Sequence, residues 1–178
     1  MAFVRIKKIK NKEYAYLVEN RWTNKGARQK SIGYLGKVIR LNKRKNPLSF
    51  DEYIKKENII LENLSTKEIA LNLIKLELIN HNFKGKENHF MENKEIRFNL
   101  TDFSVKQQDK PVVIHLNESF MCNHNISRLL NFSEEGDEDK VGFELAKAFV
   151  DAGITVPKEL FVSMFERLYK PDSRAKIK

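Results

Sequence analysis

The chain of 178 residues is long enough for one ordinary domain, or for a small module joined to a larger one. Its 41% hydrophobic and 32% charged residues, with a net charge of +9, are the balance of a globular protein, and no apolar run approaches the roughly 20 residues of a membrane span. Because Cys122 is the single cysteine and the N-terminus lacks an apolar leader, we expect a cytoplasmic protein without an intramolecular disulfide.

The first 40 residues predict three strands. Residues 3–10 alternate apolar with basic side chains, which is the pattern of a half-buried strand, and residues 14–18 are apolar on both faces, as in a central strand. After a turn-forming segment, residues 27–39 resume an extended pattern. We therefore predict an antiparallel meander, in which the third strand carries on one face Arg28, Lys30, Ile32 and Tyr34 and has a bulge or its end at Gly33 and Gly36.

Two helices are predicted after a charged connector. The segments 49–52 and 65–68 are capping boxes, in which a serine hydroxyl and a glutamate three residues later satisfy free amides at a helix start. Beyond each box, apolar residues recur at spacings of three and four. Since a small sheet alone buries too little surface to be stable, we expect both helices to cover one face of the meander in an N-terminal domain of residues 1–81.

A linker is expected at residues 82–94, where Asn, Lys and Glu are frequent. Beyond it, residues 96–100 and 112–116 have the alternation of a β-hairpin. Glycine and proline then mark the ends of further apolar stripes. Three helices are predicted there, over residues 118–130, 137–152 and 157–169.

The predicted fold class is thus α+β. The N-terminal three-stranded antiparallel meander packs on two helices, and a β-hairpin followed by a three-helix part forms a small α+β domain over residues 95–171. Apolar stripes within residues 141–169 are candidate surfaces for a homodimer or a protein partner. Residues 172–178 form a basic tail.

Positive charge is concentrated in the predicted meander and its connector. Residues 1–48 hold 14 Lys or Arg and two acids, Glu13 and Glu19, so their net charge is +12 and that of residues 49–178 is −3. A basic end joined to a slightly acidic body is typical of a docking surface for a polyanion. The alternative interpretation is a solvated, lysine-protected sheet edge that prevents aggregation.

An antiparallel ribbon fits the major groove of B-DNA, where alternate side chains reach base edges and others hold phosphates. Trp22 lies beside Arg21 at a predicted loop, where its indole either stacks on a base, gaining about 1–3 kcal/mol, or packs against the neighbouring helix. The tyrosines at 14, 16 and 34 are weaker stacking candidates. The predicted nucleic-acid-binding residues are Arg5, Lys7, Lys8, Lys10, Lys12, Arg21, Trp22, Lys25, Arg28 and Lys30.

Three strings of residues carry a family resemblance that covers about 40 of the 178 residues: Phe3-Val4-Arg5-Ile6-Lys7-Lys8, Tyr14-Ala15-Tyr16-Leu17-Val18-Glu19-Asn20, and Arg28-Gln29-Lys30 followed by Tyr34-Leu35-Gly36-Lys37. This segment resembles the N-terminal segment of insertion-sequence transposases of the DDE type. It is also similar to the start of small archaeal proteins that share the segment without the catalytic domain. The resemblance implies DNA binding without strand transfer.

No motif of catalysis is found. A DDE nuclease needs three carboxylates on an RNase-H-like sheet to hold two metals, and Asp102, Asp109 and Glu118 are not followed by the long α/β pattern of such a core. Walker A, Gly-x-Gly-x-x-Gly, nucleophile-elbow and His-Glu-x-x-His patterns are also missing from the sequence. We therefore expect a protein that is not an enzyme and has no cofactor.

Two other polar groupings are interpreted as structural. His115, Cys122 and His124 lie close in sequence, but they lack a fourth ligand and the usual two-residue spacing of a zinc site, so we expect no metal and a buried thiol. Five acids within residues 134–139 precede a helix, where they complement its dipole.

The sequence thus predicts a non-enzymatic nucleic-acid-binding protein, with double-stranded DNA favoured over RNA and with a C-terminal interaction domain. An RNA- or ribosome-associated protein remains an alternative, because backbone contacts and stacking on loops would serve RNA equally. A third interpretation is an adaptor whose C-terminal helices are the working surface, which would expose an apolar patch on the last two helices. The fourth is a transposase fragment without a selected role.

Overall fold

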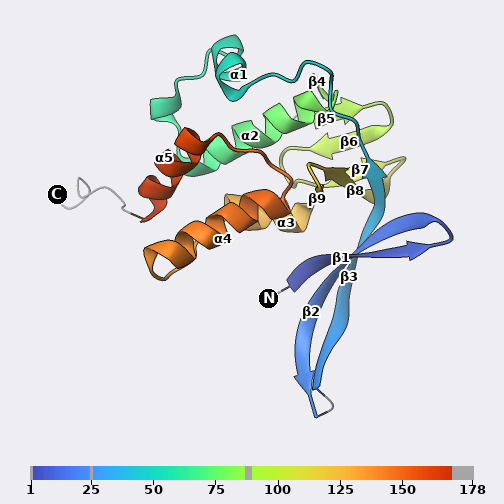
Figure 1. Ribbon diagram of the computed structural model, residues 1–178. Coiled ribbons are helices and arrows are strands. Elements are labelled where there is room, and N and C mark those ends of the chain that lie inside the picture. Colours follow the sequence, from blue (N-terminus) through green and yellow to red (C-terminus); the bar gives the residue numbers. More distant parts are fainter. Residues whose placement is uncertain (1, 25, 87–89, 170–178) are drawn as a thin grey trace.

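The computed structural model describes residues 2–24, 26–86 and 90–169, and within these ranges it is an α+β fold with nine strands in one mixed sheet and five α-helices (Figure 1). The strands are β1 (Ala2–Ile9), β2 (Lys12–Thr23), β3 (Gly26–Arg40), β4 (Lys84–Lys86), β5 (Phe90–Asn93), β6 (Ile96–Asn99), β7 (Val105–Gln107), β8 (Lys110–Leu116) and β9 (Ser119–Met121). The helices are α1 (Phe50–Lys56), the short 3-10 helix η1 (Leu61–Asn63), α2 (Thr66–Asn80), α3 (Asn123–Leu130), α4 (Glu138–Asp151) and α5 (Lys158–Tyr169). In this described part, each helix is too short or too polar to cross a membrane.

The predicted antiparallel meander of β1, β2 and β3 is confirmed. Its two hairpin ends project away from the helices (Figure 1). The first hairpin turns at Lys10 and Asn11, whose φ angles of 46° and 61° are the left-handed pair that a two-residue turn needs to match the twist of its strands. The second hairpin closes at Gly26, with φ +93°. In that turn the Thr23 hydroxyl donates a 2.8 Å hydrogen bond to the Gly26 carbonyl.

Two bulges in β3 change which of its side chains share a face. The register shifts leave Ile32 and Leu35 without a partner residue in β2, beside the glycines at which the sequence predicted a bulge. Strict alternation would place Lys30 and Tyr34 on one face, as we predicted from the sequence. That prediction is wrong, because the extra residue at Ile32 reverses the alternation and turns Tyr34 to the other face.

A parallel pairing of β3 with β8, from Lys37↔Val112 to Arg40↔His115, joins the meander to the rest of the sheet. The strand order is β1-β2-β3-β8-β7-β6-β5-β4, with β9 against β8. Gly36 makes this joint possible: its φ is +131°, and a Cβ there would lie 2.3 Å from the Pro111 carbonyl oxygen. Only glycine allows this approach of two backbones.

The segment 82–94, predicted as a linker, contains β4 and β5 among its described residues. The hairpin prediction also needs correction, because β7 lies between β6 and β8 and pairs with both. Strands of three or four residues offer too little alternation for detection in the sequence. The sheet therefore continues antiparallel from β4 to β8 without a break in its pairing.

The main hydrophobic core lies between the helices and the C-terminal strands. One contiguous buried cluster includes Phe50 of α1, Leu73 of α2, Phe98 of β6 and Phe149 of α4. The expectation that α1 and α2 cover the meander is therefore wrong. Helix α2 is apolar around most of its circumference and is therefore buried on several sides. The small, half-polar meander does not offer enough apolar surface to bury such a helix.

A second, smaller cluster covers one face of the meander at its base. Val4, Ile6 and Ala15 of the meander pack there with Phe120 of β9 and with Cys122 at the start of α3. Since adjacent residues of a strand point to opposite faces, the neighbours of these residues lie on the other face of the meander.

Candidate nucleic-acid interface

We define the open face of the meander as the face opposite the smaller cluster. Cross-strand pairs place Arg5 beside Tyr16, Lys7 beside Tyr14, and Tyr16 beside Tyr34. Its members in the described strands include four cations and three tyrosines. They are Arg5, Lys7, Lys12, Lys37, Tyr14, Tyr16 and Tyr34, with Gln29 and Trp22 nearer the end of the β2–β3 hairpin and with the apolar Phe3, Ile9 and Val18 on the same face.

Side-chain contacts hold the open face together. The Lys7 ammonium lies 4.8 Å from the centroid of the Tyr16 ring, which is a cation–π contact. The Tyr34 ring lies 5.4 Å from that of Tyr16 and 6.4 Å from that of Tyr14. The Arg5 guanidinium donates a hydrogen bond to the Gln29 side-chain oxygen. These contacts hold Lys7 over the Tyr16 ring and fix Arg5 through Gln29.

The phenol of Tyr34 remains a hydrogen-bond donor at neutral pH. Burial raises the pKa of Tyr34 above its usual 10.0, and the neighbouring phenols of Tyr14 and Tyr16 raise this pKa further. A neutral hydroxyl beside lysine and arginine can donate to a phosphate oxygen without adding negative charge. The open face therefore combines fixed positive charge with uncharged donors.

Both acids of the meander lie on the opposite face, among the described residues of β1 to β3. The Glu13 carboxylate accepts hydrogen bonds of 2.8 Å and 3.1 Å from the Arg40 guanidinium. The Glu19 carboxylate accepts one from Arg21. The carboxylates thus neutralise cations of the opposite face and leave those of the open face uncompensated by these strands.

The predicted binding residues are divided between the two faces. Arg5, Lys7, Lys12 and Trp22 share the open face, and Lys10 lies in the β1–β2 turn. Lys25 and the predicted basic tail at 172–178 lie outside the described residues. The opposite face carries Lys8, Arg21, Arg28 and Lys30.

Lys37 joins the open face, although the sequence did not predict it as a site residue. It follows Tyr34 by three residues, so strict alternation would separate the two side chains. The bulge at Leu35 brings both to one face, opposite Tyr14 and Tyr16. Gly36 was the signal in the sequence. A bulge was predicted there, but not that this bulge would bring Lys37 to the same face as Tyr34.

The histidines and cysteine considered for metal binding have structural surroundings. The His115 ring packs edge-on against Phe120, with centroids 5.1 Å apart, and burial together with the Arg40 charge lowers the pKa of His115. Burial raises the pKa of the Cys122 thiol. Within the described residues, no three His, Cys, Asp or Glu side chains are grouped to hold a metal ion.

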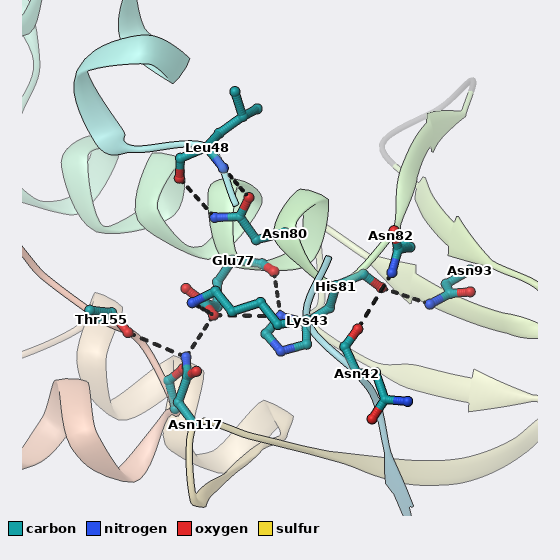
Figure 2. A network of polar contacts seen from close by, with 11 residues as sticks. Asn42, Lys43, Leu48, Glu77, Asn80, His81, Asn82, Asn93, Asn117 and Thr155 are labelled. Atoms are coloured by element: carbon teal, nitrogen blue, oxygen red, sulfur yellow. Dashed lines mark hydrogen bonds and ion pairs between the residues drawn. The ribbon is translucent and has the colours of Figure 1, made fainter. Parts of the chain in front are cut away.

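A separate polar network surrounds the end of α2 (Figure 2). The buried Glu77 carboxylate accepts a 2.6 Å hydrogen bond from Asn117 and lies 3.2 Å from the Lys43 ammonium. The side chain of Asn80 binds the backbone of Leu48 through both its oxygen and its nitrogen, at 2.8 Å and 3.0 Å. This network fastens the connector 41–48 to the body of the fold, which is the part from α1 to α5. It thereby positions the end of β3.

Comparison with protein-family models, with curated proteins and with solved structures finds no match to this chain.

Proposed function

We propose that this protein binds nucleic acid without catalysis, and that the open face of the meander contacts the phosphate backbone of double-stranded DNA. The observation that carries the proposal is the separation of charge between the two faces. The open face holds Arg5, Lys7, Lys12 and Lys37, whereas the meander's two acids are on the other face. Cations free of nearby carboxylates release counterions when they neutralise phosphates, which drives binding.

The shape of the meander supports duplex DNA as the target. Its β1–β2 hairpin, which carries Arg5, Lys7 and Lys12, projects from the body as a two-stranded ribbon (Figure 1). Such a ribbon matches the width of the major groove of B-DNA. The deep, narrow major groove of RNA does not admit a sheet.

Charge reversal on the two faces tests the contact. If about six phosphates are neutralised, log K falls against log salt with a slope of about −5. We expect Arg5→Glu with Lys7→Glu to flatten the slope by about 2, because two phosphate contacts are lost. The matched pair Arg28→Glu with Lys30→Glu makes the same change in net charge on the opposite face, and we expect a smaller effect. Equal effects of the two pairs would remove the open face from the contact.

The RNA alternative is tested by a gel-shift series at one salt concentration. Duplex DNA, a hairpin RNA and ribosomes serve as probes, and we expect the duplex to bind at the lowest protein concentration. Tighter binding of the hairpin or of ribosomes would assign the open face to RNA.

A second candidate function is an adaptor that binds protein through its C-terminal helices. The observation that favours it is the exposure of three apolar side chains: Phe143 and Val150 of α4 are 66% and 64% exposed, and Val162 of α5 is 44% exposed. An apolar surface that is contiguous over two helices marks a protein-binding site. The adaptor predicts a partner that is retained at high salt and after nuclease treatment. Recovery of nucleic acid without a protein partner would reject the adaptor function.

A further inference from the structure

Trp22 lies at the end of β2 with 86% of its surface exposed, and it is the single tryptophan of the chain. Its cross-strand partner is Ala27, whose methyl group is too small to cover an indole ring. Tryptophan carries the largest apolar surface of any side chain, so proteins usually bury it. At this exposure the indole contributes little to the stability of the fold.

The surroundings of Trp22 favour an anionic ligand with a flat apolar part. Trp22 is on the open face, where alternation along β2 places it in line with Tyr16 and Tyr14. Arg5 and Lys7 lie further along the same face, whereas Arg21 and Arg28, at the level of Trp22, are on the opposite face. The hydrogen bond from Thr23 to Gly26 closes the turn beside it and fixes the hairpin end. Aromatic side chains and cations exposed on one face are the arrangement by which proteins hold the bases and phosphates of a single strand.

We propose that Trp22 stacks on an unpaired base, so that the target is nucleic acid in which a duplex adjoins an unpaired segment. This inference rests on the proposed function and adds the form of the target. Trp22 is six residues from Tyr16, or about 20 Å along an extended strand. A duplex held at Arg5 and Lys7 therefore places an adjoining single strand at the hairpin end. Bases within an intact helix are stacked on both faces and offer no free face to the indole.

Intrinsic fluorescence tests the inference directly, because all tryptophan emission of the chain comes from Trp22. The probes are a blunt DNA duplex, the same duplex with a short single-stranded overhang, and heparin, which is a polyanion without bases. We expect the overhang to quench the emission, and the blunt duplex and heparin to bind with little quenching.

Substitutions at Trp22 test its contribution to affinity. Trp22→Ala should weaken binding of the overhang probe by roughly 5- to 100-fold, as for loss of one base stack, and should abolish its advantage over the blunt duplex. Trp22→Phe keeps an aromatic face and should retain most of that advantage. The matched control is Ile60→Ala, which removes another large apolar side chain, 61% exposed, from the α1–η1 connection.

The outcomes separate this inference from the proposed function. Binding of the overhang probe without quenching, with equal affinity for Trp22→Ala, would overturn the stacking role and leave the DNA-binding function intact. Failure of every nucleic acid and of heparin to bind would overturn both. If Trp22→Ala instead abolished self-association in sedimentation without changing nucleic-acid binding, the indole would be a contact between copies of the chain, which also overturns the inference.

Discussion

Gly36 and Gly33 are three residues apart in β3, yet the structure requires glycine at one of them and not at the other. Gly36 has φ +131° and faces the backbone of Pro111 at the joint between β3 and β8. Gly33 has no positive φ, and a Cβ there would meet only the Cβ of Leu17, at 3.8 Å, which is ordinary van der Waals contact. The first glycine is therefore needed for the joint, whereas the second is replaceable.

We expect Gly36→Ala to lower the free energy of unfolding by about 2 kcal/mol or more, because the new Cβ strains φ and displaces β8. Gly33→Ala is the matched control and should change the free energy of unfolding by less than about 1 kcal/mol. Urea denaturation of both variants measures the difference. Similar values for the two would mean that β3 and β8 are not held as closely as their pairing indicates.

Helix α2 is the element around which the body is built. Its N-terminus has the predicted capping box, in which the Ser65 hydroxyl accepts from the Glu68 amide. Its C-terminal end carries Glu77 and Asn80, both 3% exposed, which bind the connector between β3 and α1 (Figure 2). Because buried polar groups are costly unless paired, this end of α2 specifies where the connector must lie.

Asn80→Ala should therefore lower the free energy of unfolding by about 1–3 kcal/mol, since the amide and carbonyl of Leu48 lose their partner. Asn42→Ala removes an exposed side chain from the same connector, at a position whose φ is not positive. For this control we expect a change within about 0.5 kcal/mol. Thermal denaturation of the two variants compares them, and an Asn80 variant as stable as its control would contradict the role of α2 as an anchor.

At the scale of the whole molecule, one sheet and one main core link parts that the sequence suggested were separate domains. The main core takes side chains from α1 and α2 before segment 82–94 and from α3, α4 and α5 after it. The smaller cluster ties the meander to β8, β9 and the start of α3. Opening either part therefore exposes apolar surface of the other.

We predict that the chain unfolds in one cooperative transition, because in the described part of the chain the buried cluster of the meander is shared with β8, β9 and the start of α3. Cys122 provides a local probe, since its buried thiol lies between the meander and the body and its pKa is raised by burial. Reaction of this thiol with an aromatic disulfide should follow the same urea dependence as the circular dichroism signal. Reaction at lower urea, or two calorimetric peaks, would show that the meander detaches first.

The local features of this protein follow from its sequence alone. Alternation and turn residues specify the three strands of the meander, and Ser65 with Glu68 specifies where α2 begins, because these signals act between residues close in the chain. Net charge likewise identified the basic end. Only the tertiary structure decided which cations share a face, where α2 packs and that β3 pairs with β8. Those outcomes depend on two bulges, on short strands with weak alternation, and on contacts between residues far apart in sequence, such as Gly36 with Pro111.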